Sequence, residues 1–165
     1  MRSFEELVAE AEAADVGGWD FGWLDGRATE ERPPWGYARR LAGRLAEVGS
    51  ALDLDTGGGE VLAQAPILPS RTCATESWPP NAQRARDRLA QRGVAVVETA
   101  PGEALPFADD AFALVSSRHP VRPAWGEIAR VLEPGGRYLA QHVGPASAFE
   151  LIEHFLGPRH PQAEA

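Results

Sequence analysis

The sequence predicts an α/β fold: a three-layer α/β/α doubly wound domain whose mostly parallel sheet has about five strands. Two observations lead to this prediction. Short apolar runs alternate with helical stretches along the chain, and the first run, at 51–54, leads into three consecutive glycines at 57–59. Alternating strands and helices are typical of a parallel sheet that is covered on both faces. A glycine-rich turn after the first strand lets a ligand approach bare backbone.

Composition and charge limit the classes of protein that fit this chain. Its 165 residues suit one domain, and 44% hydrophobic with 24% charged residues is ordinary for a globular protein. The net charge of −8 and the scattered arginines predict no nucleic-acid surface. No apolar stretch is long enough to span a membrane, and the first residues do not resemble a signal peptide. The lone Cys73 cannot form an internal disulfide, so we expect a cytoplasmic protein.

Residues 1–50 are expected to form N-terminal helices and an aromatic cap segment. Ser3 and Glu6 have the spacing of a capping box at the start of a helix. The segment 16–37 is rich in aromatic residues and is interrupted by glycine and proline pairs, which favours a loop with one short turn. Helical spacing of apolar residues returns over 36–48.

The core is expected over 51–157, followed by a tail at 158–165. Apolar runs define its strands, and apolar periodicity ended by glycine or proline defines its helices. The run at 94–98 is continuously apolar, as in a strand buried on both faces. The expected strands are 51–54, 71–76, 94–98, 111–116 and 137–142, and the expected helices are 60–65, 79–92, 123–132 and 149–156.

Four segments follow one another along the core: the glycine loop at 53–59, the acid Glu76, the segment 103–112 and the segment 127–138. Taken together and in this order, they resemble the class I S-adenosylmethionine-dependent methyltransferases, and the resemblance runs from about 19 to 157. It implies a Rossmann-like fold, S-adenosylmethionine as cofactor, and S-adenosylhomocysteine as a product of methyl transfer.

The resemblance also implies which residues hold the cofactor. Asp53 would pair with the cationic end of the methionine moiety, and backbone N–H groups of the glycine loop would meet its polar parts. Glu76 would accept hydrogen bonds from both ribose hydroxyls. Asp55 replaces the usual first glycine, and aspartate tolerates left-handed backbone better than most residues. The implied set is Asp53, Asp55, Thr56, Gly57, Gly58, Gly59, Glu76, Ser77, Gly102, Glu103, Arg32 and Tyr37.

Several of these positions have narrower expected roles. The backbone at Gly102 and Glu103 would cradle the adenine, Arg32 would bind the cofactor's carboxylate, and Tyr37 would add a hydrogen bond to it. His119 follows the fourth strand, where the family places residues that face the substrate. It would act there as a general base for a hydroxyl acceptor, or as a loop residue bonded to backbone. The remaining histidines are too dispersed to predict a metal site.

The methyl acceptor stays open at this point. The acidic charge favours a small molecule; an RNA-directed methyltransferase and a non-catalytic module that binds the cofactor or a partner remain alternatives. The family's sheet normally has seven strands, whereas the apolar runs of this chain end after the fifth. We therefore expect one of two situations: the chain is a fragment or a natural truncation, or a homodimer or another partner covers the edge of that strand.

Overall fold

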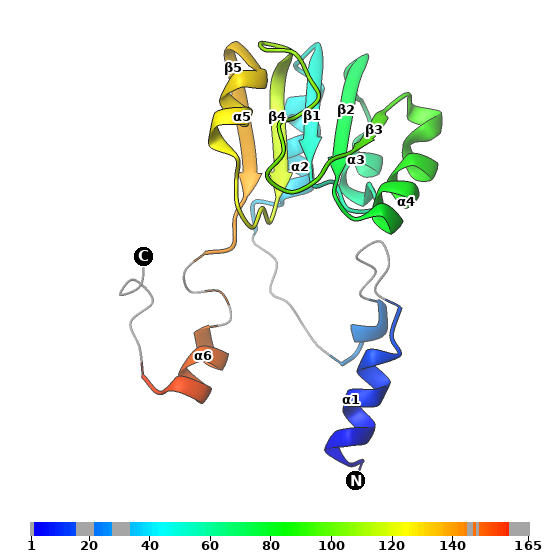
Figure 1. Ribbon diagram of the computed structural model, residues 1–165, viewed down its shortest axis with the longest axis vertical. Coiled ribbons are helices and arrows are strands. Elements are labelled where there is room, and N and C mark those ends of the chain that lie inside the picture. The colour runs from blue at the N-terminus through cyan, green and yellow to red at the C-terminus, as the bar shows by residue number, and fades with distance from the viewer. Residues whose placement is uncertain (1, 16–21, 28–33, 145–146, 148, 159–165) are drawn as a thin grey trace.

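The computed structural model describes residues 2–15, 22–27, 34–144, 147 and 149–158. Within these residues, five strands form one sheet in the order β3-β2-β1-β4-β5, and every neighbouring pair is parallel (Figure 1). The predicted doubly wound α/β fold is therefore confirmed. The strands are β1 (Ser50–Leu54), β2 (Arg71–Glu76), β3 (Ala95–Glu98), β4 (Phe112–Arg118) and β5 (Leu132–Gln141).

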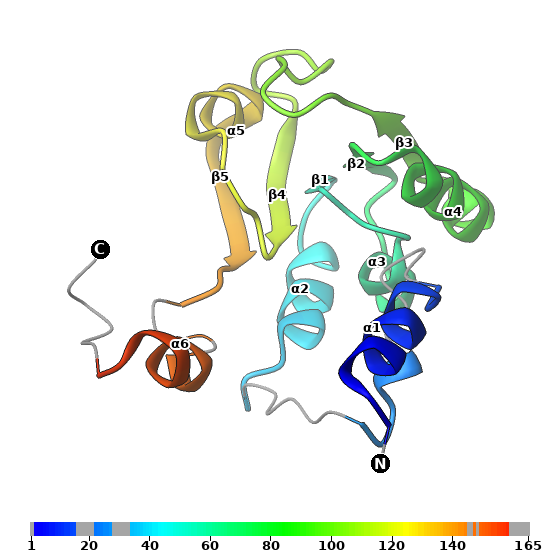
Figure 2. The same ribbon diagram turned by 60° about the horizontal axis from the view of Figure 1, so that its bottom comes forward.

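Three helices cover one face of the sheet: α2 (Tyr37–Leu45), α3 (Glu60–Gln64) and α4 (Pro79–Leu89), which continues into the 3-10 turn η3 (Ala90–Arg92) (Figure 2). Their apolar sides meet the strands in one buried cluster. Full burial of one leucine side chain is worth about 1.5–3 kcal/mol, so a few such residues fix the helices on the sheet. The leucines and strand residues of this cluster include Leu41, Leu45, Leu62, Leu89, Ala51 and Leu114.

The opposite face carries helix α5 (Trp125–Val131) and the connecting segment 99–111, which crosses in front of the sheet (Figure 1). Leu105 and Phe107 of this segment pack on the second buried cluster. The Phe107 ring meets the Phe112 ring edge to face, with 5.1 Å between centroids. Through this packing, the segment covers part of this face of the sheet, where a helix would otherwise lie in the third layer. The fully buried members of the cluster are Leu52, Phe112, Val115, Ile128 and Val131.

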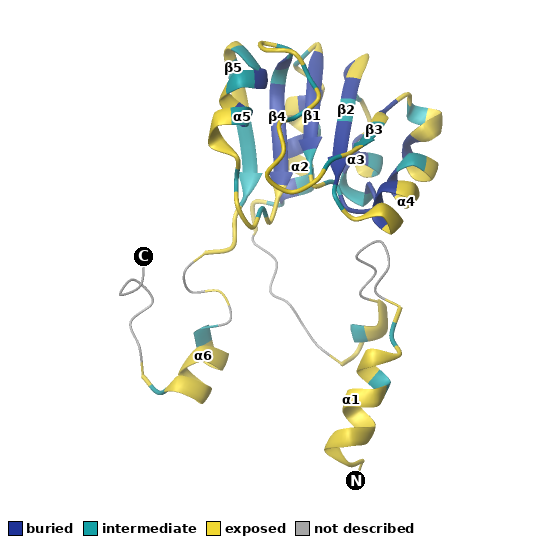
Figure 3. Ribbon diagram, in the orientation of Figure 1, coloured by how far each residue is buried: buried dark blue, intermediate teal, exposed yellow. Residues whose placement is uncertain are grey.

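Two helices, α1 (Phe4–Glu12) and α6 (Phe149–Leu156), stand apart from the sheet, beyond the carboxyl ends of its strands (Figure 1, Figure 2). Figure 3 shows both as largely exposed, while the central strands are buried. The capping box predicted for α1 is confirmed: the Glu6 N–H donates to Ser3 Oγ (3.2 Å), and the Ser3 N–H donates to Glu6 Oε2 (2.8 Å). Among the described helices, none is both long and apolar enough to cross a membrane.

The fifth strand begins earlier than predicted. Phe112 pairs with Leu132 and Leu114 with Arg137, so the four residues 133–136 of β5 lie opposite the single residue Ala113 of β4. Residues 133–136, which separate the predicted helix at 123–132 from the predicted strand at 137–142, therefore form an irregularity within a longer strand. Gly136 is required there, because a Cβ would lie 2.8 Å from the carbonyl oxygen of Glu133.

The amino-terminal region agrees with the expectation in outline. The 3-10 turn η2 (Gly22–Leu24) is the short turn of the aromatic segment, and α2 ends at Leu45, earlier than the expected 48. Residues 16–21 and 28–33, which include Trp19, Phe21 and Arg32, lie outside the described residues. The predicted tail also lies outside them, apart from Pro158.

Arginine side chains hold the end of α4 to the loops around α3. The Arg88 guanidinium donates to the carbonyl oxygen of Gly58, and Arg92 donates to that of Ala63 at 2.8 Å. A guanidinium carries five N–H donors in a planar fork, so one side chain can hold several carbonyl groups. The sequence contains no lysine, and every such contact is made by arginine.

Gly59 offers a direct test of the packing between the glycine loop and α4. Its φ is +78°, and a Cβ at this position would lie 2.9 Å from Leu89 Cδ1. Since an alanine would be strained in both respects, we expect Gly59→Ala to lower the free energy of unfolding by about 1–3 kcal/mol in urea denaturation. Gly43→Ala is the matched control: a Cβ added to this helical glycine would meet no neighbouring atom within 4 Å, so alanine should stabilise by about 0.5–1 kcal/mol. Equal stability of the two variants would contradict the close packing of Gly59 against Leu89.

Candidate functional site at the carboxyl ends of the strands

The predicted site residues gather at one edge of the sheet. Asp53 of β1 lies beside Ala74 of β2 and Ser116 of β4 in the strand register. The glycine loop follows β1 directly, and Glu76 is the last residue of β2. The carboxyl ends of parallel strands are where open α/β sheets bind their ligands. The structure therefore brings the first strand's acid, the glycine loop and the second strand's acid together, as the sequence predicts.

The Glu76 carboxylate is buried, with 5% of the residue exposed, and it holds two loops by their backbone. Its Oε2 accepts from the Gly57 N–H at 2.7 Å, and its Oε1 accepts from Ser77 at 3.0 Å and Trp78 at 2.9 Å. These charge-assisted bonds offset the cost of burying the acid. A carboxylate has about four acceptor positions, and three are used here. In this conformation one acceptor position of the Glu76 carboxylate is left. It has room for one of the two hydrogen bonds that the sequence predicts from the ribose hydroxyls.

The glycine loop has an unusual backbone. Asp55, Gly57 and Gly59 have φ values of +52°, +63° and +78°, all in the left-handed region. Asp55 thus takes the conformation that the replaced glycine would supply, as expected for an aspartate. The loop is fixed to β2 by the Thr56 N–H, which donates to the carbonyl oxygen of Thr75 at 2.9 Å.

Asp53 is buried in a different setting from Glu76. Only 7% of the residue is exposed, and its Oδ1 accepts a hydrogen bond from Ser116 Oγ at 2.5 Å. Burial raises the pKa of Asp53 to about 6, against the opposing effect of the Ser116 hydrogen bond. None of the ion pairs formed among the described residues involves Asp53. This carboxylate would gain from a cationic ligand, because the Ser116 hydroxyl that donates to it carries no charge.

Tyr37, the first residue of α2, fastens that helix to the sheet. Its hydroxyl donates to the carbonyl oxygen of Ser117 at 3.1 Å, with that of Leu139 at 3.5 Å. Burial, and then the nearby Asp53, hold the pKa of Tyr37 above its ordinary value. A tyrosine hydroxyl has a single proton, and here the protein backbone uses it. The expected hydrogen bond to the cofactor's carboxylate is therefore not available in this conformation.

The connecting segment 99–111 contains the residues predicted to meet the adenine, and it is called the adenine segment. It begins beside Glu76. The Thr99 N–H donates to the carbonyl oxygen of Glu76 at 3.2 Å, and the Glu103 N–H closes a turn onto Ala100 at 3.2 Å. Gly102 lies within this turn with a φ of +82°. The structure thus places Gly102 and Glu103 in a turn that follows the carboxyl end of β3, and their role in holding the adenine stays a prediction.

His119 lies at the same edge, immediately after β4. It is exposed, its φ is +55°, and its N–H donates to the carbonyl oxygen of Gln141 at 2.7 Å. Left-handed backbone is uncommon for residues other than glycine, and histidine is among the residues that adopt it more often. The structure places His119 where the sequence predicts it, and its role as a base stays a prediction.

Three hydroxyl-bearing residues lie near this edge. The sequence places Ser116 and Ser117 in the segment that would face the substrate, but it predicts neither the contact between Ser116 and Asp53 nor a role for Tyr138. The side-chain oxygens of Ser117 and Tyr138 are buried without a hydrogen bond of normal geometry. Serine and tyrosine at strand positions carry no distinctive signal. Only the register, which sets Asp53 opposite Ser116, brings the first of them into the site.

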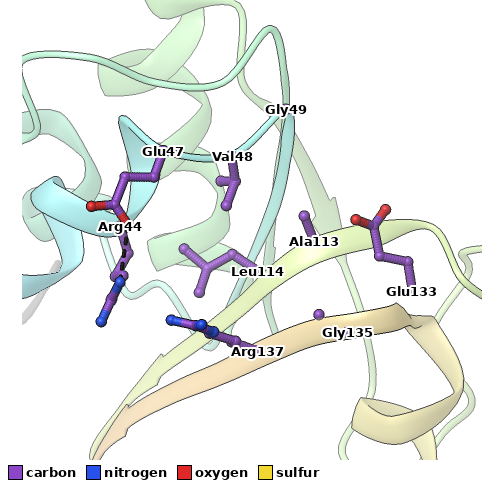
Figure 4. Close-up of a pocket in the computed structure, with 10 residues that line it drawn as sticks. Arg44, Glu47, Val48, Gly49, Ala113, Leu114, Glu133, Gly135 and Arg137 are labelled. Atoms are coloured by element: carbon purple, nitrogen blue, oxygen red, sulfur yellow. Dashed lines mark hydrogen bonds and ion pairs between the residues drawn. The ribbon is translucent and has the colours of Figure 1, made fainter.

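A cavity of about 480 Å³ lies at the other end of the sheet, at the amino ends of β1, β4 and β5 (Figure 4). Its charged lining residues are Arg44, Glu47, Glu133 and Arg137, and Arg44 pairs with Glu47 at 2.9 Å. None of the predicted site residues lines it. Within the described ranges, no group of His, Cys, Asp and Glu side chains is arranged to hold a metal ion.

Comparison with known proteins agrees with this geometry. A family model described as a methyltransferase domain matches residues 52–140. An uncharacterized protein of Mycobacterium tuberculosis is 31% identical over 125 residues, which are 72% of this chain and 46% of that protein. The chain thus spans about half the length of the curated relatives it matches.

Many solved structures share the fold, and two of them are as follows. One is a Haloferax volcanii protein in complex with the methyltransferase activator Trm112, with 24% identity, a TM-score of 0.58, and coverage of 81% of this chain and 62% of that one. The other is a geranyl diphosphate methyltransferase in complex with GPP and sinefungin, with 18% identity, a TM-score of 0.56, and coverage of 72% and 50%.

The buried Asp53 should make stability depend on pH. Its pKa is raised from 3.8 to about 6 on folding, so the folded state holds this proton more tightly than the unfolded state. The resulting stabilisation is complete below about pH 4 and is lost as the pH rises to about 6, by up to about 3 kcal/mol. Asp53→Asn should remove this loss and be the more stable protein at about pH 7.5, as measured by urea denaturation over a pH series. Asp25→Asn, at an exposed turn, is the control and should keep the wild-type dependence of stability on pH. If Asp53→Asn shows the same dependence on pH as the wild type, Asp53 is not the group responsible.

Proposed function

Because the chain belongs to the methyltransferase domain family and has the class I S-adenosylmethionine-dependent methyltransferase fold, we propose that it transfers a methyl group from S-adenosylmethionine to a small-molecule acceptor. The observation that carries the proposal is the meeting of Asp53, the glycine loop and Glu76 at one edge of the sheet. In this proposal residues 51–157 form the core that binds the cofactor, residues 1–50 form N-terminal helices and an aromatic cap segment, and the protein works in the cytoplasm.

The residues at this edge suit the chemical groups of the cofactor. Its methionine moiety carries a positive amino group, and Asp53 is a buried carboxylate with no arginine partner among the described ion pairs. Its ribose offers hydroxyl donors, and Glu76 has an acceptor position left. When bound, the cofactor supplies the electrophilic methyl group itself. The protein then has to orient the acceptor and exclude water, and little acid–base chemistry is required of it.

The acceptor is proposed to lie beyond β4 and β5. His119 and the buried hydroxyls of Ser117 and Tyr138 belong to these strand ends. If the acceptor is a hydroxyl, His119 is the proposed base. The net charge of −8 supports a small molecule over RNA, because a polynucleotide requires a basic surface. No preference among small molecules follows from these side chains.

We also propose that the outer edge of β5 receives a partner. Within the described residues β5 is the last strand of the sheet, and an edge strand presents unpaired backbone groups that can pair with another chain. A homodimer and a separate protein both fit this edge. The Haloferax volcanii neighbour was solved in complex with a methyltransferase activator, which is a precedent on this fold for a separate protein as partner. Light scattering of the purified chain distinguishes the two, since a monomer excludes the homodimer.

Calorimetry with S-adenosylhomocysteine tests the cofactor assignment. We expect saturable binding that is roughly tenfold tighter at pH 7 than at pH 5, because the ionised Asp53 is the form that pairs with the amino group. In Asp53→Asn this pH dependence should disappear. Absence of binding by the wild type at millimolar ligand would refute the proposal. Binding without methyl transfer to any acceptor would instead favour a non-catalytic module, and salt-dependent binding of RNA would favour the RNA-directed alternative.

A further inference from the structure

We propose that Arg130 and Glu127 of α5 act as a clamp that positions the adenine segment, so that cofactor affinity depends on two side chains that do not reach the cofactor. This inference rests on the proposed function. It concerns the connecting segment 99–111, which forms part of the third layer without any helix or strand of its own. A chain segment of this kind has no internal backbone ladder to hold its shape.

The guanidinium of Arg130 is the centre of the clamp. Its Nη2 donates to the carbonyl oxygen of Leu105 at 3.0 Å, and its Nη1 donates to that of Phe107 at 2.8 Å. Nη1 also lies 2.8 Å from Asp109 Oδ1. One side chain therefore binds three alternate residues of the segment, which a single-point cation such as an ammonium could not do in this geometry.

Glu127 completes the clamp from the preceding turn of the same helix. Its two oxygens accept from Arg130 Nε at 2.8 Å and Nη2 at 2.7 Å, which sets the plane of the guanidinium. Its Oε2 also accepts from the Leu105 N–H at 2.7 Å. Leu105 is thus held at both its N–H and its C=O. Hydrogen bonds from Arg130 hold the pKa of Glu127 at about 2, so the clamp stays ionised at any pH used for binding.

The clamp matters for the site because of what lies just before it. The Thr99 N–H is bound to the carbonyl oxygen of Glu76, and Leu105 is bound to the clamp. The five residues between these anchors include Gly102 and Glu103, the predicted adenine cradle. Fixing a short span at both ends restricts the conformations of the backbone that meets the adenine. A ligand then orders less chain on binding, and its affinity rises.

Arg130→Gln and Arg130→Lys test this inference, with Arg44→Gln as the control. Arg44 forms an ion pair of the same i,i+3 spacing with Glu47, on α2 and far along the chain from the segment. Hydrogen exchange of peptides covering 99–111 is one readout. The others are affinities for S-adenosylhomocysteine and for methylthioadenosine, which keeps the adenosine and lacks the amino-acid part.

We expect both Arg130 variants to exchange faster in 99–111 while the central strands keep their protection. Both ligands should lose affinity by a similar factor, roughly tenfold, because the lost contacts act on the adenine side. Arg130→Lys should resemble Arg130→Gln, since it keeps the charge and loses the fork. Arg44→Gln should change neither readout.

Unchanged exchange in 99–111 would overturn the clamp. Faster exchange with unchanged affinity for both ligands would overturn its link to the cofactor, as would a loss confined to S-adenosylhomocysteine. If the wild type binds neither ligand, the proposed function fails. The exchange experiment still decides in that case whether Arg130 holds the segment.

Discussion

The site depends on one buried anion. Glu76 ends β2, and its carboxylate accepts from the backbone of the glycine loop on one side and from Ser77 and Trp78 on the other. Without it, the Gly57 N–H and the turn into α4 would lose their partner inside the protein, where an unsatisfied polar group is costly. The carboxylate thus holds the glycine loop and the turn into α4, and the backbone carbonyl oxygen of the same residue accepts from the Thr99 N–H of the segment that leaves β3.

The two acids of the site have opposite surroundings. Glu76 accepts hydrogen bonds from three backbone N–H groups, whereas Asp53 accepts from the Ser116 hydroxyl and has a pKa raised by burial to about 6. An anion whose acceptor positions are mostly filled fixes geometry, and an anion that lacks a positive partner favours the binding of one. Glu76 is therefore mainly a structural element, and Asp53 is the acid whose ionisation would respond to a bound cation.

Much of this arrangement can be read from the sequence, because strands, helix ends and the glycine loop are set by neighbours along the chain. The capping box of Ser3 and the left-handed Asp55 are local features of this kind, and the sequence predicts both. The features that it does not predict are non-local. The early start of β5, the proton of Tyr37 donated to Ser117, and the reach of Arg130 to residues over 20 positions away depend on pairing and packing that no local pattern encodes.

The absence of lysine has a consequence for how the protein responds to its surroundings. Arg88, Arg92 and Arg130 bind carbonyl oxygens of the loops, and a guanidinium keeps its proton throughout the range in which proteins fold. These braces therefore do not weaken as the solution becomes more acidic or more basic. Asp53, by contrast, changes its charge near pH 6. The arginine contacts thus keep their charge over a pH range in which Asp53 gains or loses its own, so acidification changes the charge at the carboxyl ends of the strands while the arginine contacts to the loops remain.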